Sequence, residues 1–210
     1  MFITFEGLDG SGKTTQAKRV AEHLRAQDYN VLLTREPGGT LISDQIRDVV
    51  LKKGTDELMN PRTELLLFCA SRAQLVAHVI RPHLANGGVV LCDRYTDSTL
   101  AYQGYGHGLD LPTLKTILHF ATDGLRPDLT LYFDITPENA LRRKQQASLF
   151  GEEWNRLDDM EFQFHTRVYE GYQRLQEEEP ARWAVIDAMG TVDAMFQAVV
   201  ETLDARMAVG

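Results

Sequence analysis

The sequence contains little cysteine and no grouped set of metal-binding side chains. Two of its 210 residues are cysteines, and both Cys69 and Cys92 stand within apolar stretches. We expect both to be buried, reduced thiols, because such cysteines behave as small hydrophobic residues. Two separated cysteines and six scattered histidines provide neither a disulfide framework nor the spacing of a zinc site. These absences argue against a disulfide-stabilised fold and a zinc protein.

The sequence also lacks an excess of positive charge and a long hydrophobic run. It has 22 Lys and Arg against 30 Asp and Glu, a formal net charge of −8. This argues against nucleic acid or an anionic membrane as a partner, because both require a basic footprint. No apolar run approaches the ~20 residues of a membrane span, and the N-terminal MFITFEG leads directly into a motif rather than a cleavable signal. We expect a cytoplasmic protein without nucleic-acid or membrane partners.

Short apolar runs alternate with helical patterns along the chain. Hydrophobic residues make up 43% of the sequence, enough for the core of one domain over residues 1–210. The apolar runs predict strands at 2–5, 31–34, 89–92, 129–133 and 183–186. Because most are continuous rather than alternating, we expect a parallel sheet that is buried on both faces.

The segments between these runs predict helices. The first helical pattern has one apolar stripe, formed by Ala17, Val20, Ala21 and Leu24. A long helix is predicted over Pro61–Ala85, disturbed near Pro82, and a closing helix over Val192–Met207. The alternation predicts an α/β fold of the P-loop NTPase type, with a doubly wound five-stranded parallel sheet flanked by helices. Ligands of such sheets bind at the carboxyl ends of the strands.

One segment interrupts this pattern. Residues 144–155, KQQASLFGEEWN, combine weak periodicity with a glycine and mixed polarity. We interpret them as a mobile loop between two helices, within a lid segment of about 142–156.

The segment GLDGSGKT at residues 7–14 matches the pattern G-x-x-x-x-G-K-[ST] between a predicted strand and a predicted helix. Backbone N–H groups of such a loop and the following helix N-terminus attract phosphate oxygens. We expect Lys13 to reach the β- and γ-phosphates of ATP and Thr14 to offer its hydroxyl to Mg²⁺. The predicted ATP-binding residues are Gly7, Leu8, Asp9, Gly10, Ser11, Gly12, Lys13, Thr14 and Thr15.

A second nucleotide element follows the run at 89–92, where Asp93 and Arg94 come directly after the predicted strand. A carboxylate there can join Thr14 as a metal ligand, and the neighbouring arginine can bind a phosphate. A structural ion pair between the two is the alternative. The predicted metal ligands are therefore Thr14 and Asp93.

The residues outside the phosphate loop indicate the class of reaction. The Asn-Lys-x-Asp motif of guanine-specific GTPases is absent, and the chain is short for a motor or a transporter ATPase. Several arginines outside the loop and one flexible segment fit phosphoryl transfer between two small molecules. Arginines offset the repulsion between two polyanions, and a closing lid excludes water that would hydrolyse ATP.

Four further segments are specific. They are TREPGGT at 34–40, FCASRAQ at 68–74, DRYTDSTLAYQG at 93–104 and LTLYFDITPE at 129–138. Together with the phosphate loop they resemble the thymidylate kinases, up to about Arg143 and again from Arg156 through VIDA at 185–188. The resemblance implies transfer of a phosphoryl group from ATP to dTMP with Mg²⁺, and a homodimer.

The resemblance also implies roles for residues at the acceptor base and sugar. Phe68 is expected to stack on thymine and Arg72 to donate to a thymine carbonyl. Thr99 and Gln103 are expected to contact the base edge, directly or through water. Tyr102 is expected to pack under the deoxyribose, where a 2′-hydroxyl would clash. Phe68 and Tyr102 as ordinary core residues are the alternative.

Three charged residues and the phosphate loop are expected to surround the acceptor phosphate. The resemblance places Arg47 and Arg94 on that phosphate, with Glu36 orienting the site and its magnesium water. Asp9 is expected to accept from the sugar 3′-hydroxyl or to approach the metal. For Arg47, an exposed position on a helix is the alternative.

The chain departs from the family pattern in its catalytic cations. The loop residues Asp9-Gly10-Ser11 include no basic residue, and the lid lacks the later arginines of an Arg-x-Arg-x-Arg-Gly run. Arg143 is the first choice for the cation that acts with Lys13 and Arg94 in catalysis. Alternatively, Arg143 stacks on adenine, and Lys144 or Arg156 reaches the phosphates. The carboxylates after the lid, Asp158, Asp159 and Glu161, are interpreted as belonging to a helix start. Pairing with the lid arginines is the alternative.

Two other functions stay open from the sequence. One is a kinase of another nucleoside monophosphate or of a deoxynucleoside. The other is a nucleotide-binding protein that has lost catalysis, which the missing lid arginines keep in consideration.

Overall fold

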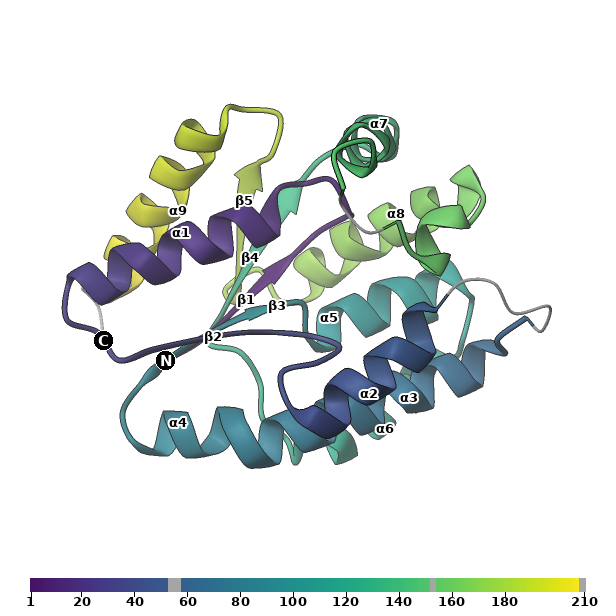
Figure 1. The fold of residues 1–210 in the computed structure, drawn as a ribbon, viewed down its shortest axis with the longest axis horizontal. Coiled ribbons are helices and arrows are strands. Elements are labelled where there is room, and N and C mark those ends of the chain that lie inside the picture. Colours follow the sequence, from purple (N-terminus) through teal and green to yellow (C-terminus); the bar gives the residue numbers. More distant parts are fainter. Residues whose placement is uncertain (53–57, 152–153, 208–210) are drawn as a thin grey trace.

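The computed structural model describes residues 1–52, 58–151 and 154–207. Within these residues one sheet of five strands has the order β2-β3-β1-β4-β5, and every pair is parallel (Figure 1). The strands are β1 (Phe2–Glu6), β2 (Val31–Arg35), β3 (Val89–Asp93), β4 (Leu129–Asp134) and β5 (Trp183–Asp187). The predicted α/β fold and all five predicted strands are confirmed.

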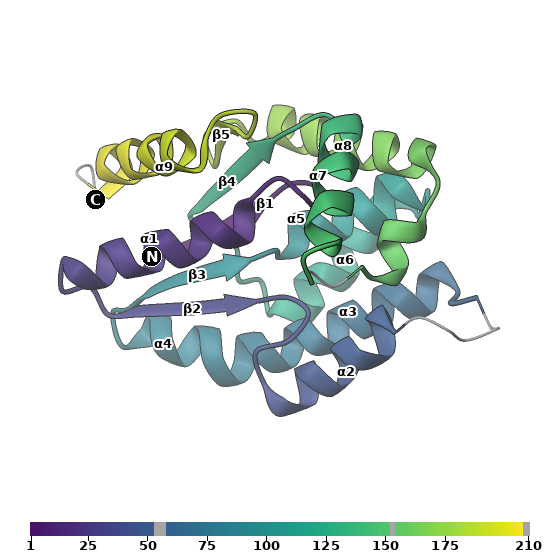
Figure 2. The ribbon, with the colours of Figure 1, turned by 45° about the horizontal axis from the view of Figure 1, so that its top comes forward.

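Each strand extends one residue beyond its predicted end. The additional residues are all charged: Glu6, Arg35, Asp93, Asp134 and Asp187. The apolar pattern stops at the last nonpolar residue, whereas the strand continues for one more residue. The arrowheads in Figure 2 point towards the side of the molecule where α2, α3 and α7 lie. The carboxyl edge of the sheet is therefore lined with charge.

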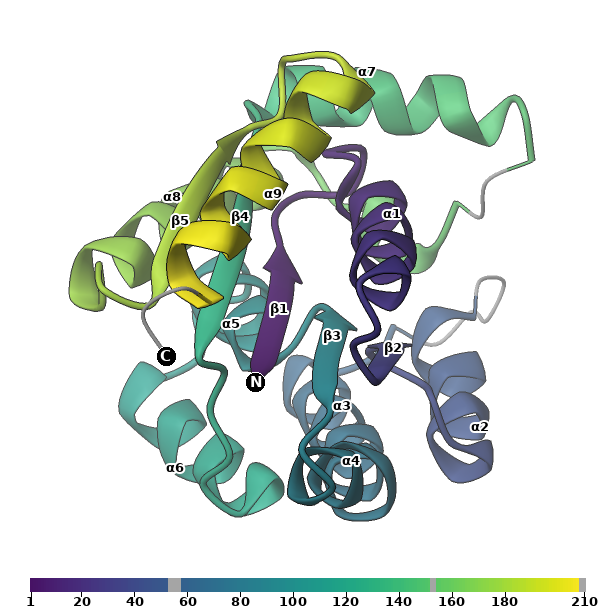
Figure 3. The same cartoon turned by 90° about the vertical axis from the view of Figure 1, so that its left-hand side faces the viewer.

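Helices cover both faces of the sheet. Figure 3 shows α1 (Lys13–Ala26) and α9 (Val192–Met207) on one face, with α3 (Pro61–Leu75), α4 (Arg81–Ala85) and α6 (Leu111–Thr122) on the other. The remaining helices are α2 (Leu41–Leu51), α5 (Thr96–Thr99), α7 (Pro137–Ser148) and α8 (Phe162–Glu178). Two π-helical segments, Val76–Ile80 and Leu100–Gly106, and a 3₁₀ turn, Arg156–Asp159, complete the described elements.

The core follows the predicted pattern. The stripe of α1, formed by Ala17, Val20, Ala21 and Leu24, is at most 2% exposed. Cys69 and Cys92 are buried free thiols, as expected. Strand residues Ile3, Phe5 and Leu131 are fully buried between the two helical layers, which explains the continuous apolar runs.

The long helix predicted over Pro61–Ala85 is present but divided. The π-helical segment Val76–Ile80 separates α3 from α4 directly before Pro82, which cannot donate a backbone hydrogen bond. By length and composition Pro61–Ala85 could cross a membrane, which differs from the expectation of no such run. Leu65, Leu75 and Ile80 are buried against the sheet layer, so we interpret the stretch as a core helix.

The loop predicted at 144–155 begins too early. Helix α7 continues through Lys144 to Ser148, because lysine, glutamine and alanine favour helices even where apolar periodicity is weak. Lys144 is 9% exposed. Residues 152 and 153 of the predicted loop lie outside the described residues.

Candidate active site

The phosphate-binding loop connects β1 to α1 beneath α7. Gly10 has a φ of +87°, and a Cβ there would lie 2.3 Å from the carbonyl oxygen of Ala140 in α7. Only glycine permits this backbone and this close approach. Gly12 caps the N-terminus of α1 with a φ of 88°. The loop therefore brings its backbone N–H groups to a helix N-terminus, the arrangement that binds phosphates.

Lys13 begins α1, and its side chain turns back over the loop. Its Nζ donates to the Leu8 carbonyl oxygen at 3.3 Å and to Asp9 Oδ1 at 3.2 Å. Asp9 Oδ1 also accepts from Arg94 Nη2 at 2.8 Å. Burial opposes ionisation of Asp9, but Arg94 and Lys13 hold its pKa well below its usual range. One ionised carboxylate therefore holds both cations beside the loop.

Thr14 and Asp93 meet across the sheet edge. Thr14 Oγ1 donates to Asp93 Oδ2 at 2.5 Å, because β3 pairs directly with β1, which precedes the loop. The other oxygen, Asp93 Oδ1, is buried and has no hydrogen-bond partner among the described residues. A hydroxyl beside such a carboxylate suits Mg²⁺, which binds through few protein oxygens together with substrate phosphates. The residues present thus fit the predicted metal.

Arg94 follows β3 in a left-handed backbone conformation, with a φ of 71°. Such a conformation costs a non-glycine residue on the order of 1–3 kcal/mol and is concentrated at functional sites. Its guanidinium donates to Ser98 Oγ at 2.9 Å and to Tyr102 Oη at 3.2 Å. It also lies 5.0 Å from the centroid of the Tyr102 ring. These contacts hold a strained arginine in one position.

Two cavities meet at the carboxyl edge of the sheet. The larger, of about 480 Å³, is lined by the phosphate loop with Lys13 and Thr14, and by Arg143 and Lys144 of α7. The smaller, of about 100 Å³, lies beside α3 and the segment after β3. Both are lined by Asp9, Glu36, Arg47, Arg94 and Asn155. A polar and mostly charged boundary therefore joins the two cavities.

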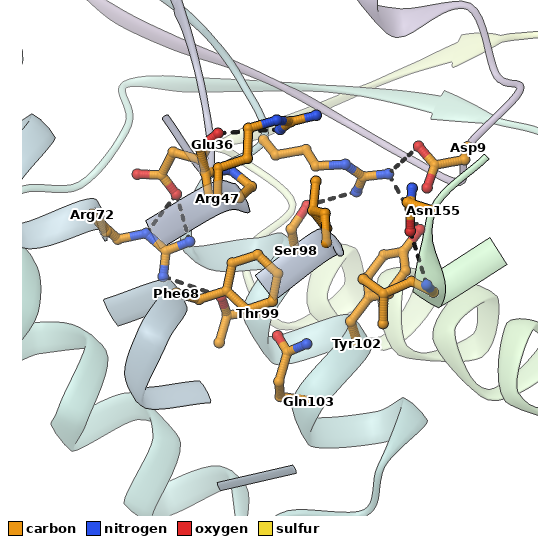
Figure 4. A pocket seen from close by; sticks show the side chains of 14 residues that line it. Asp9, Glu36, Arg47, Phe68, Arg72, Ser98, Thr99, Tyr102, Gln103 and Asn155 are labelled. Carbon is orange, nitrogen blue, oxygen red and sulfur yellow. Dashed lines mark hydrogen bonds and ion pairs between the residues drawn. The ribbon is translucent and has the colours of Figure 1, made fainter. Parts of the chain in front are cut away.

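The smaller cavity contains every residue predicted for the acceptor base and sugar. Its lining includes Phe68, Arg72, Thr99, Tyr102 and Gln103 (Figure 4). These residues come from α3, α5 and the π-helical segment after it. A flat aromatic ring beside amide, hydroxyl and guanidinium groups can bind a planar heterocycle by stacking and by edge hydrogen bonds.

Arg72 is 1% exposed, and its guanidinium is fixed in place. Nε donates to Glu36 Oε2 at 2.7 Å, and Nη1 donates to Thr99 Oγ1 at 3.0 Å. Burial raises the pKa of Glu36, although Arg72 opposes this. Nη1 carries two hydrogens, and Thr99 is its one acceptor among the described residues. The other hydrogen can therefore bond a carbonyl group in the cavity.

Arg47 on α2 also reaches this site. Its Nη1 donates to the Pro37 carbonyl oxygen at 3.1 Å, and the residue lines both cavities. Its position at the boundary argues against the alternative of a purely exposed helix arginine.

The four candidate lid cations have different partners. Arg142 Nη2 donates to Asn139 Oδ1 at 2.8 Å on an exposed surface. Arg143 Nη1 donates to the Ala188 carbonyl oxygen at 2.6 Å, just beyond β5. Arg156 donates to Glu64 and to the Val50 carbonyl oxygen.

The backbone of Lys144 lies beside the phosphate loop. A Cβ built on Gly10 would be 3.1 Å from the Lys144 backbone nitrogen. Lys144 Nζ is 4.0 Å from Asp158 Oδ2, and its charge helps to lower the pKa of Asp9. Asp158 therefore lies beside a lid cation, which the preferred interpretation of a carboxylate at a helix start did not include. Burial and Asp9 raise the pKa of Asp158 to about 6.

Two residues that hold Arg94 in place, Ser98 and Tyr172, were not predicted from the sequence. Ser98 Oγ and Tyr172 Oη, which contact Arg94, also donate to the buried carboxylate of Glu6, at 2.5 and 2.9 Å. Burial and Asp97 raise the pKa of Glu6 to about 7. The one sequence feature that could have indicated this network is Glu6, a carboxylate directly after an apolar run. Asn155, which lines both cavities, gave no signal beyond its place in the lid.

Comparisons with known proteins agree with this geometry. The thymidylate kinase family model matches residues 5–199. A thymidylate kinase of Roseiflexus castenholzii is 52% identical over 217 residues, covering 99% of this chain and 94% of that protein. One from Caldanaerobacter subterraneus subsp. tengcongensis is 45% identical, covering 97% and 94%.

A solved structure extends the agreement to the fold. The crystal structure of thymidylate kinase from Ehrlichia chaffeensis superposes with a TM-score of 0.76 at 34% identity, covering 97% of this chain and 98% of that one. The family model and the relatives cover nearly the whole chain, including both cavities. The chain belongs to the thymidylate kinase family.

Proposed function

We propose that this chain transfers the γ-phosphoryl group of ATP to the phosphate of dTMP, which yields ADP and dTDP. The observation that carries this proposal is the pair of cavities that share Asp9, Arg47 and Arg94. One cavity is built around a phosphate loop, and the other is lined by groups suited to a nucleobase. A phosphoryl group transferred between their occupants would cross the charged boundary.

On the donor side, backbone N–H groups of the loop and Lys13 bind the β- and γ-phosphates. Thr14 and Asp93 would hold Mg²⁺, which would supply charge neutralisation between the phosphates of ATP. Lys13 stabilises the negative charge that develops on the transferred group. Its present partner, Asp9, keeps the ammonium beside the loop before phosphate competes for it.

On the acceptor side, Phe68 stacks on thymine, Arg72 donates to a base carbonyl and Tyr102 packs against the deoxyribose. Thr99 completes the base site, because its Oγ1 accepts a hydrogen bond of 3.0 Å from Arg72 Nη1 and holds the guanidinium in place. No general base is required, because acceptor phosphate oxygens are already nucleophilic. Positioning and charge neutralisation therefore supply the catalytic effect.

Arg94 and Arg47 bind the acceptor phosphate at the boundary of the two cavities. Asp9 orients Arg94 and accepts from the sugar 3′-hydroxyl. Glu36 accepts a hydrogen bond from Arg72 and helps to orient a water molecule that would bind Mg²⁺. A fixed arginine pair offsets the repulsion between the two substrates.

Two lid cations stand as candidates for the transferred phosphoryl group. Arg143 was the first choice from the sequence, and it lines the donor cavity. The Lys144 backbone lies beside Gly10 and its charge helps to lower the pKa of Asp9, whereas the Arg143 guanidinium bonds to the Ala188 carbonyl oxygen after β5. We therefore assign the phosphate to Lys144 and the adenine end of ATP to Arg143. This is the alternative that the sequence left open.

The remaining proposals concern the setting of the enzyme. We propose a single kinase domain over residues 1–210 that acts in the cytoplasm as a homodimer, without nucleic-acid or membrane partners. A net charge of −8 supports the absence of polyanionic partners. Exposed apolar side chains on the neighbouring helices α2 and α3, such as Val49 and Leu66, support a dimer interface there.

Acceptor specificity tests the proposed function. With ATP and Mg²⁺ held constant, we expect dTMP to have the highest kcat/KM among dTMP, dUMP, dCMP, dGMP and thymidine. Thymidine should be a poor acceptor, because it lacks the phosphate that Arg94 and Arg47 bind. Initial rates of ADP formation give the kcat/KM of each acceptor. A higher kcat/KM for any of the other four acceptors would contradict the assignment of thymine and favour the other kinases considered above.

A further inference from the structure

Glu64, in the first turn of α3, is a buried carboxylate beside the acceptor cavity. The residue is 0% exposed. Its Oε1 accepts from Gln103 Nε2 at 2.6 Å and lies 3.2 Å from His107 Nε2. Its Oε2 accepts from Arg156 Nη2. The carboxylate is therefore surrounded by three nitrogen groups from distant parts of the chain.

These contacts keep Glu64 ionised. Burial by itself would raise its pKa, but the nearby His107 and the hydrogen bonds from Arg156 and Gln103 lower it below the usual value. An ionised carboxylate can only accept hydrogen bonds. The group that faces Glu64 from Gln103 must therefore be the NH₂ of its amide.

This requirement determines which end of the amide faces the cavity. Gln103 lines the acceptor cavity, and its Oε1 has no hydrogen-bond donor among the described residues. Figure 4 shows the amide end of Gln103 directed towards the ring of Phe68. With Nε2 held by Glu64, the carbonyl oxygen is the group left to contact a ligand. The cavity thus offers the base an acceptor.

We propose that Glu64 is a positioning residue for base selection: it orients the Gln103 amide so that its carbonyl accepts a hydrogen bond from the base. Thymine carries an N–H at N3 and can donate to this carbonyl. Cytosine has an acceptor nitrogen at the same position, so the two acceptors would repel. The inference rests on the proposed function, because it assumes that a pyrimidine occupies this cavity.

Arg156 connects the base-selecting residues Glu64 and Gln103 to the end of the lid segment. It contacts Glu64 and also donates from Nε to the Val50 carbonyl oxygen of α2 at 3.3 Å. Its neighbour Leu157 lines the acceptor cavity. Arg156 therefore supplies charge that keeps the carboxylate ionised, rather than charge for the phosphates.

The test is the variant Glu64→Gln, measured as the ratio of kcat/KM for dTMP to that for dCMP. A glutamine has nearly the same shape but can present either end of its amide, so the Gln103 amide is free to turn. We expect the ratio to fall by about tenfold, the size of one hydrogen bond. The change should appear in KM for both acceptors, while KM for ATP and kcat with dTMP stay near the wild-type values.

A double-mutant cycle separates positioning from a structural effect. In the Gln103→Ala background, Glu64→Gln should no longer change the ratio, because the group through which it acts is gone. Glu178→Gln, at an exposed carboxylate paired with Lys115, is the matched control and should leave the ratio unchanged. An unchanged ratio in folded Glu64→Gln, or an equal change in both backgrounds, would overturn the proposal.

Wild-type protein provides an independent measurement if the variant fails to fold. dTMP methylated at N3 lacks the N–H, and we expect its KM to rise at least about tenfold. Equal KM values for the methylated and unmodified acceptors would overturn the role of the carbonyl. Failure of the proposed function is distinguishable, since wild-type protein would then show no preference for dTMP in any of these assays.

Discussion

Replacement of Lys13 with alanine is expected to reduce kcat by at least about 10³-fold, because it removes a preorganised cation from the transition state. Lys13 is 4% exposed and lies on the loop that binds the donor phosphates. The loop itself offers no substitute cation, since Asp9-Gly10-Ser11 includes no basic residue. Rates at saturating ATP, dTMP and Mg²⁺ measure the effect.

The comparison for this variant is Lys115→Ala. Lys115 is half exposed and pairs with Glu178, outside the lining of both cavities. It should retain the wild-type kcat, and the thermal midpoints of both variants should show that the fold is intact. A folded Lys13→Ala protein with nearly normal kcat would refute the role of the phosphate loop in catalysis.

The lid cation gives the second large effect. Lys144→Met keeps the volume of the side-chain stem and removes its charge. We expect kcat to fall by about 10²-fold, with little change in KM for dTMP. Arg143→Met should instead raise KM for ATP and change kcat less, because its guanidinium bonds to the Ala188 carbonyl oxygen after β5.

The paired variants decide between the two assignments. Steady-state kinetics with ATP and dTMP varied separately gives kcat and both KM values for each protein. A larger fall in kcat for Arg143→Met than for Lys144→Met would restore Arg143 as the cation that acts on the transferred phosphate. Arg142→Met, at an exposed position, is the control and should resemble wild type in all three constants.

The parts of the fold that could be predicted depend on local pattern. Continuous apolar runs marked every strand, because both sheet faces are covered by helices. The charged strand ends such as Glu6 and Asp187 were missed, since a hydrophobic pattern reports apolar side chains rather than backbone pairing. The helix through Lys144 was missed for the same reason: its residues favour a helix without forming an apolar stripe.

The site was predictable where a motif carries its own chemistry. The phosphate loop and the residues around Phe68 and Arg94 are contiguous segments, and the structure brings their side chains to the two cavities. Partnerships across the chain were not predictable. Glu64 stands 39 residues from Gln103 and 92 from Arg156, and no local spacing indicates that the three meet.

The most direct test of the central claim is to follow the phosphoryl group itself. Phosphorus NMR of the protein with ATP, Mg²⁺ and dTMP records each phosphate separately. If ATP and dTMP bind in the two cavities, the signals of ADP and dTDP should grow together while ATP and dTMP decline in equal amounts. Binding of ATP and dTMP without formation of dTDP would contradict the proposed function and favour a nucleotide-binding protein that has lost catalysis.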